Sequence, residues 1–96
     1  MAELDPVIHA QARLRIMAAL ATREVGESVA FPRLQELLAM TAGNLSTHLR
    51  KLEDADYVEV AKTFSGRTPV TYLSLTRTGR RAFEDYMDSL RSLLGQ

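Results

Sequence analysis

The sequence contains no cysteine and no apolar run long enough to cross a membrane. Without thiols, the chain forms no disulfides, uses no thiolate nucleophile and offers no cysteine ligands to a metal. A membrane helix needs about 20 consecutive apolar residues, and a signal peptide starts with a basic region, whereas this N-terminus carries acidic residues. These absences predict a cytoplasmic protein.

Histidine is almost as scarce as cysteine. His9 and His48 are far apart and lack the spacing of a metal-binding pair such as HxxxH. The chain contains no GxSxG motif and no phosphate-binding glycine loop, and its acidic residues are scattered rather than paired at one site. We therefore predict no metal site, no cofactor and no catalytic residue, so the protein is expected not to be an enzyme.

The chain does contain enough apolar material for one small core. Hydrophobic residues make up 46% of its 96 residues, which suits a single domain. A chain of this length buries a modest fraction of its surface and often gains stability from oligomerisation. Because no repeat, low-complexity segment or linker divides it, we predict one domain over residues 1–96.

The charges balance over the whole chain but not along it. Twelve Lys and Arg stand against twelve Asp and Glu, and a net charge of zero argues weakly against a nucleic-acid partner. Residues 42–81 nevertheless hold seven basic and four acidic side chains, which leaves five basic and eight acidic ones at the two ends. Scatter in a small sample explains this asymmetry as well as a cationic surface does.

Two helices are predicted in the first part of the chain. The first spans about residues 5–22, with Asp5 as a suitable N-cap and Pro6 at the first helical position. The second is short; it begins near Pro32, again suited to a helix start, and ends near Ala39.

The third and fourth helices have clear starts. Thr41 is suited to cap a helix over about residues 41–55, and the tight corner before it gives the helix-turn-helix arrangement. Asp56 follows at the exit, where the backbone is commonly left-handed, and Asp tolerates that conformation better than most residues. Thr76 is suited to cap a long last helix over about residues 77–94, which carries a broad apolar stripe.

Alternating β-branched and aromatic residues predict two strands before the last helix. They cover about residues 57–64 and 70–75, and the turn between them carries Gly66 and Arg67 at its tip. Residues 29–31 are a candidate for a further, very short strand. The predicted fold class is therefore α+β, mainly α, with a two- or three-stranded antiparallel sheet and a long C-terminal helix.

This order of elements is that of a winged helix-turn-helix, and the sequence resembles the compact winged-helix transcriptional regulators related to the MarR and ArsR families. The similarity covers almost the whole chain. It is carried by "HAQARLRIMAAL" in the first helix, "FPRLQELLAMTAGNLSTHLRKLEDADYV" through the helix-turn-helix, and "SGRTPVTYLSLTRTGRRAF" through the hairpin, or wing, into the last helix. We accordingly expect a homodimeric regulator of transcription, a repressor, that binds double-stranded DNA.

The resemblance implies that the helix over residues 41–55 lies in the DNA major groove and that the wing, about residues 64–70, contacts the minor groove or the backbone. Short hydrogen-bonding and small side chains lead this helix, and cationic ones follow. The predicted DNA-binding residues are Thr41, Ala42, Gly43, Asn44, Ser46, Thr47, His48, Arg50, Lys51 and Arg67.

These residue types suit different parts of a DNA duplex. Asn44 can read adenine through two hydrogen bonds, and the methyl group of Thr47 can contact thymine. Arg50 and Lys51, further along the helix, suit phosphate contacts. Arg67 has the reach and charge for a narrow minor groove.

Ordinary structural roles remain open for several of these residues. His48 can be a solvated helix residue, Asn44 a hydrogen-bonding partner for the preceding turn, and Arg67 an exposed turn residue. The arginines between residues 77 and 81 are unfavourable to the dipole of the last helix. Either these arginines bind an outside anion, or they form an ordinary solvated face.

Two features of the resembling families are missing from this sequence. The stretch "LQELLAM" has no cysteine pair such as metal-sensing ArsR members often place there, so that sensing chemistry is not implied. Ser65 stands where many MarR members have an acidic residue two places before the wing arginine. Both the existence and the identity of a small-molecule effector therefore stay open.

The two terminal helices, about 5–22 and 77–94, carry more apolar residues than one small domain needs to cover, so we predict that they form a homodimer interface. A monomer that buries both stripes is the alternative. A dimer would read a pseudo-palindrome with half-sites about one helical turn apart. Two other functions stay open: a protein-interaction module, and a ligand sensor with a pocket between the first and last helices.

Overall fold

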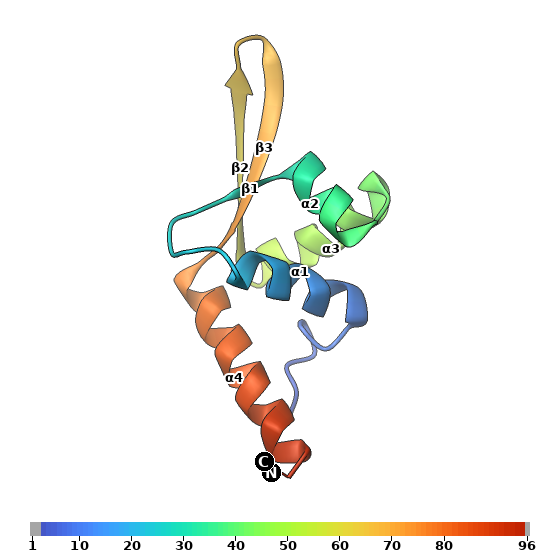
Figure 1. The fold of residues 1–96 in the computed structure, drawn as a ribbon, viewed down its shortest axis with the longest axis vertical. Helices are drawn as coiled ribbons and strands as arrows, with labels where there is room; N and C mark the ends of the chain where they lie inside the picture. Colours follow the sequence, from blue (N-terminus) through green and yellow to red (C-terminus); the bar gives the residue numbers. More distant parts are fainter. Residues whose placement is uncertain (1–2, 96) are drawn as a thin grey trace.

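The computed structural model describes residues 3–95, which form four helices and three strands. In chain order these are α1 (Gln11–Ala21), β1 (Val29–Ala30), α2 (Phe31–Leu38), α3 (Ala42–Asp54), β2 (Val58–Ser65), β3 (Thr68–Leu75) and α4 (Arg77–Leu93). The molecule is elongated, 51 × 25 × 21 Å, with the β2–β3 hairpin and the end of α4 at opposite ends (Figure 1). The predicted winged-helix fold, mainly helical with a small antiparallel sheet, is confirmed. No helix among the described residues is both long and apolar enough to span a membrane.

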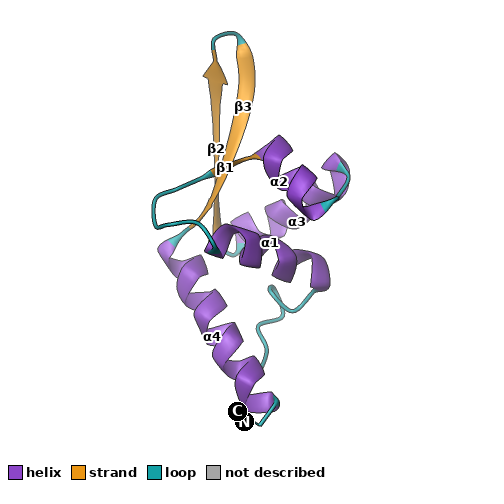
Figure 2. Ribbon diagram, in the orientation of Figure 1, coloured by secondary structure: helices purple, strands orange, loops and turns teal. Residues whose placement is uncertain are grey.

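The sheet has three antiparallel strands in the order β1-β3-β2. β2 and β3 pair along their whole length, from Val58 with Leu75 at the base to Ser65 with Thr68 at the tip. β1 adds only two residues, beside the base of β3. The outer half of the hairpin therefore has no third strand and stands clear of the helices (Figure 2).

The hairpin closes through the two-residue turn Gly66–Arg67. Gly66 has a φ of 66°, while Arg67 is not among the residues with positive φ. This combination is typical of a type II′ turn, which takes glycine at its first central position and matches the twist of the strands. The turn was predicted over residues 65–69 and is shorter, because a II′ turn needs two residues and leaves the flanking ones in the ladder.

α1 starts at Gln11 rather than near residue 5, so the predicted start of this helix is wrong. Ala10 is extended, with φ −142° and ψ 131°. Asp5 still caps a local turn, since its Oδ1 accepts a hydrogen bond from the backbone N–H of Val7 at 2.8 Å. Its other carboxylate oxygen accepts a hydrogen bond from the hydroxyl of Tyr57, which draws the segment to the base of the hairpin instead of into a helix.

Two side-chain contacts hold the N-terminal segment against the rest of the fold. The hydrogen bond to Asp5, then burial, then the charge of Asp5 raise the pKa of Tyr57 to about 12. The folded state thus keeps this proton more tightly, so the contact stabilises the fold fully below the ordinary pKa of 10.0 and loses this contribution as the pH rises through about 12. His9 Nδ1 lies 2.9 Å from the hydroxyl of buried Tyr86 on α4. A cavity beside these contacts is lined by residues 3–6, Tyr57 and α4, and not by α1.

The core lies where α1, α2 and α3 meet the base of the sheet. Leu45, Leu49 and Leu52, which recur at helical spacing in α3, are all buried. Burying an aliphatic side chain of this size is worth about 1.5–3 kcal/mol. The most completely buried side chains are Ile8, Ile16, Met17, Leu20, Leu34, Leu45, Leu52, Leu73 and Val58.

α4 is anchored to the base of the hairpin through its first turn. The Oγ1 of Thr76 accepts a hydrogen bond from the N–H of Gly79 at 2.8 Å, which confirms the predicted cap, and donates one to the carbonyl of Asp56. The N–H of Thr76 donates to the carbonyl of Tyr57 at 3.1 Å. A Cβ at Gly79 would lie 2.0 Å from that same carbonyl oxygen, so only glycine permits this close approach.

Candidate nucleic-acid interface

α3 begins at the predicted cap and ends at the predicted left-handed exit. The Oγ1 of Thr41 accepts a hydrogen bond from the N–H of Asn44 at 3.1 Å, which satisfies one of the otherwise unpaired N–H groups at the helix start. Ala39, with φ 53°, ends α2 in the left-handed conformation and makes the corner tight. Asp56, with φ 63°, turns the chain out of α3 into the hairpin.

Nine of the ten predicted DNA-binding residues are exposed, and the tenth, His48, is half-buried. The helical period places Gly43, Thr47 and Arg50 opposite the buried leucines. Ser46 lies on the flank toward the hairpin, and His48 on the flank toward α1. The proposed contact face of α3 is therefore not used for packing within the subunit.

The flank of α3 toward α1 holds His48 in a defined orientation. Nη1 of Arg13 lies 3.4 Å from Nδ1 of His48, and the same guanidinium donates to the carbonyls of Val7 and Pro6. Because a guanidinium only donates, Nδ1 of His48 is the acceptor in this contact. Within residues 3–95 no group of three or more His, Asp or Glu side chains is placed to hold a metal ion, so the ring belongs to no such cluster.

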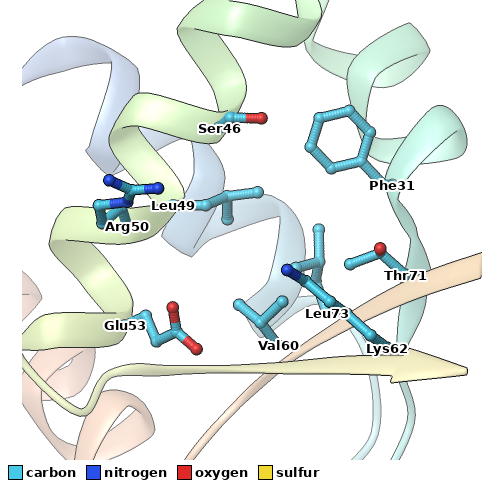
Figure 3. Close-up of a pocket in the computed structure, with 9 residues that line it drawn as sticks. All are labelled: Phe31, Ser46, Leu49, Arg50, Glu53, Val60, Lys62, Thr71 and Leu73. Atoms are coloured by element: carbon cyan, nitrogen blue, oxygen red, sulfur yellow. The ribbon is translucent and has the colours of Figure 1, made fainter.

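The other flank of α3 faces the hairpin across a groove (Figure 3). Arg50 lies on the helix side and Lys62 on the hairpin side, above an apolar floor. Within residues 3–95 neither cation takes part in an ion pair of the fold, and the groove also holds the carboxylate of Glu53. The groove is lined by Phe31, Ser46, Leu49, Arg50, Glu53, Val60, Lys62, Thr71 and Leu73.

Lys62 lines this groove but is not among the residues predicted from the sequence to bind DNA. Its position two residues after Val60, which lines the same groove, was the available signal, because alternate strand residues share a face. Arg67, by contrast, lies at the exposed tip, and the groove does not include it. Glu59 lies at the base of the hairpin, but residues 60–75 beyond it contain Lys62 and Arg67 and no acidic residue, so the outer part of the hairpin is cationic.

A second group of arginines lies at the start of α4, on the other side of the molecule from the start of α3 (Figure 1). Arg77 and Arg81 are exposed, and Arg80 donates a hydrogen bond to the carbonyl of Arg23 at 3.3 Å. One of the three is therefore used within the fold. The group is separate from the face formed by α3 and the wing.

Comparison with known proteins identifies the family. A family model described as a winged helix DNA-binding domain matches residues 12–94. An uncharacterised protein of Methanocaldococcus jannaschii is 34% identical over 87 residues, which cover 91% of this chain and 91% of that protein. The family model thus covers the whole hairpin and all four helices, apart from the first residue of α1.

Solved structures give the same result. The transcriptional regulator homologue protein from Pyrococcus horikoshii OT3 has a TM-score of 0.84 and 29% identity, over 93% of this chain and 85% of that chain. MepR of S. aureus, solved as a complex with DNA, has a TM-score of 0.75 at 15% identity, over 91% of this chain and 68% of that chain, and so is similar in fold. The predicted winged-helix family is confirmed by the family model, and the likeness to a MarR family member, ZitR of Lactococcus lactis, is one of fold, with a TM-score of 0.66 at 18% identity over 99% of this chain and 62% of that chain. The chain therefore belongs to the winged helix DNA-binding domain family and has the architecture of a transcriptional regulator.

Proposed function

We propose that the protein is a sequence-specific repressor of transcription that binds double-stranded DNA as a homodimer and catalyses no reaction. The observation that carries the proposal is the exposed face of α3, opposite its buried leucines, in a chain of the winged helix DNA-binding family. A face that served only solubility would be filled with Glu and Lys. This one carries Asn, Ser and Thr, which are weaker helix formers and versatile hydrogen-bonding groups.

The start of α3 suits close approach to base edges. Asn44 and Thr47 are exposed there and carry the short polar groups that read adenine and thymine. A Cβ at Gly43 would meet nothing within 4 Å, so the fold itself does not require glycine at this position. The space in front of Gly43 and Ala42 is thus available to a nucleic-acid backbone, which the positive end of the helix dipole would attract.

Cationic side chains surround this polar centre and suit phosphate contacts. Arg50 and Lys51 follow on α3, and Lys62 adds a third cation across the groove. At the tip of the wing, Arg67 reaches beyond the helices and suits a neighbouring minor groove. In this proposal α3 reads sequence, while the cations set the register and orientation of the domain.

The homodimer is proposed to form through α4 and the N-terminal segment. Leu93 and Leu94, at the end of α4, are 54% and 68% exposed. The apolar residues of α1 are less available, since Ile16, Met17 and Leu20 are buried within the subunit. We therefore expect the second copy to cover the end of α4.

Sedimentation at micromolar concentration tests the dimer. The unmodified chain should sediment as twice the chain mass, and the double variant Leu93→Glu with Leu94→Glu should sediment as a monomer, because two charges would have to be buried at the interface. Val25→Glu is the matched control, since Val25 is 80% exposed elsewhere on the surface. A chain that is monomeric without any substitution contradicts the dimer.

Selection of bound duplexes from a random pool tests the DNA-binding function. Asn44→Ala should lose discrimination at one position of each half-site, by about 1–3 kcal/mol. Arg67→Ala should weaken binding to all duplexes and lower the salt dependence by about one phosphate contact. Thr78→Ala, exposed on α4, is the control and should leave selection unchanged.

The outcome that rejects the proposed function is a folded chain that enriches no duplex at low ionic strength. A protein-interaction module would give that result. Binding that falls steeply with added salt would instead exclude a module that meets proteins alone, because counterion release produces the steep fall.

A further inference from the structure

We propose that Phe64 and Pro69 form an apolar contact surface on the wing that packs against the sugar edges of the DNA minor groove. This contact would add to the affinity for DNA a contribution that does not fall with added salt. The contacts between the cations and the phosphates, by contrast, weaken as salt is added. The inference rests on the proposed DNA binding and names a second kind of contact within it.

Phe64 lies on the face of the hairpin that is directed toward α3. Alternate side chains of a strand share a face, so Phe64 points the same way as Val60 and Lys62. Both of those residues line the groove against α3, as do Thr71 and Leu73 from β3 (Figure 3). Phe64 therefore extends this face outward, past the end of the groove and toward the tip.

Pro69 is the partner of Phe64 across the ladder. Ser65 and Thr68 flank the two-residue turn and form the hydrogen-bonded pair, which makes the next pair non-hydrogen-bonded. Side chains approach most closely at such a position, and a proline there loses no ladder hydrogen bond. The ring of Pro69 and the ring of Phe64 thus lie next to each other on one face.

The fold itself gains little from Phe64. Its side chain is 68% exposed, and it is not among the apolar residues packed against the core. An exposed aromatic residue near the end of an edge strand invites unwanted strand pairing. Such a residue is better explained by an external surface that covers it than by the stability of the subunit.

The charges around Phe64 favour DNA as that surface. Residues 60–75 carry Lys62 and Arg67 and no acidic residue. This part of the hairpin therefore attracts a polyanion, whereas it would be repelled by the same cationic part of a second copy. Minor-groove proteins place apolar side chains, Phe and Pro among them, against the sugars or between base steps. Pyrimidine–purine steps deform most easily, so we expect the wing to favour such a step beneath Phe64.

A salt titration separates this contact from the charge contacts. On a duplex obtained by selection, Phe64→Ala should bind about tenfold more weakly at every salt concentration, with an unchanged slope of log affinity against log salt. Arg67→Ala should flatten the slope. Phe64→Leu, which keeps much of the apolar area, should lose less than Phe64→Ala, and Val25→Ala, which truncates an 80% exposed side chain away from the tip, should match the unmodified chain.

A second readout uses the base step under the wing. The unmodified chain should lose affinity when a TA step there is replaced by GG, and Phe64→Ala should bind both duplexes equally. Equal affinity of Phe64→Ala and the unmodified chain for the selected duplex overturns the inference and leaves the proposed function standing. Failure of the unmodified chain to bind any duplex rejects the proposed function instead. A Phe64→Ala variant with altered sedimentation would place Phe64 between copies of the chain, which also overturns the inference.

Discussion

The first turns of α3 and α4 share a threonine cap and a glycine but have different surroundings. Each helix follows a threonine whose hydroxyl accepts a hydrogen bond from the third residue: Thr41 from Asn44, and Thr76 from Gly79. Each first turn contains a glycine and no acidic residue. A Cβ at Gly43 would meet nothing within 4 Å, whereas one at Gly79 would lie 2.0 Å from a backbone oxygen.

The comparison separates residues that the fold requires from residues that it leaves unconstrained. At α4, the cap and the glycine both serve the contact with the base of the hairpin, so the sequence there is explained by packing. At α3, the cap serves the helix, but the small and polar residues after it make few contacts within the subunit. Their identity is better explained by a partner, which is the basis of the proposed DNA contact.

The largest expected effect is at the packed helix start. Gly79→Ala places a methyl group against the carbonyl of Tyr57, and relief requires α4 to move away from the hairpin. We expect a loss of about 3 kcal/mol or more in the free energy of unfolding, measured by denaturant titration. Thr78→Ala, the exposed neighbour, should change it by less than about 0.5 kcal/mol. A Gly79→Ala variant as stable as this control would show that the contact is not tight.

The two caps should differ by a smaller amount. Thr76→Ala removes an acceptor for Gly79 and also a donor to the carbonyl of Asp56, whereas Thr41→Ala removes the cap bond alone. We expect losses of about 2 and about 1 kcal/mol, respectively, in the free energy of unfolding. The corresponding Thr→Ser variants keep the hydroxyl and should retain most of the stability. Equal losses at the two positions would mean that the Asp56 contact adds nothing.

The smallest change in stability should be at the open helix start, and it should be favourable. Gly43→Ala replaces a glycine inside a helix, so we expect about 0.5 kcal/mol more stability by thermal unfolding. The same methyl group occupies the space proposed for the DNA backbone, so affinity for a selected duplex should fall. Unchanged affinity in a more stable variant would remove Gly43 from the proposed interface and weaken the contrast with Gly79.

Local sequence rules predicted the helix-turn-helix well because the interactions that define it are local. The cap at Thr41 is bonded three residues along, and the left-handed exit at Asp56 is fixed by its own backbone angle. The buried leucines of α3 follow from helical spacing alone. These rules also placed the predicted contact residues, apart from Arg67 at the tip of the hairpin, on α3 and its cap, although the assignment of those residues to DNA stays a prediction.

The same rules failed where the deciding partner is distant in sequence. Asp5 has the right chemistry for a helix cap, but the hydroxyl of Tyr57, 52 positions away, donates a hydrogen bond to its carboxylate and holds it in a different arrangement. His48 was treated as a polar residue of one helix, but it contacts Arg13 on α1, which lies 35 positions earlier in the sequence. Lys62 was missed for a related reason, since its role appears only when the hairpin and α3 are seen to share a groove.

The elongated shape has a mechanical consequence for a pair of subunits. The tip of the wing and the end of α4 lie at opposite ends of a 51 Å axis (Figure 1). Where two copies join near the end of α4, each subunit acts as a lever, and a rotation of a few degrees at the joint swings the wing tip through several ångströms. The joint, which lies far from any residue that touches DNA, then sets the distance between the two half-sites that such a pair can span. A substitution at the joint would therefore change that distance.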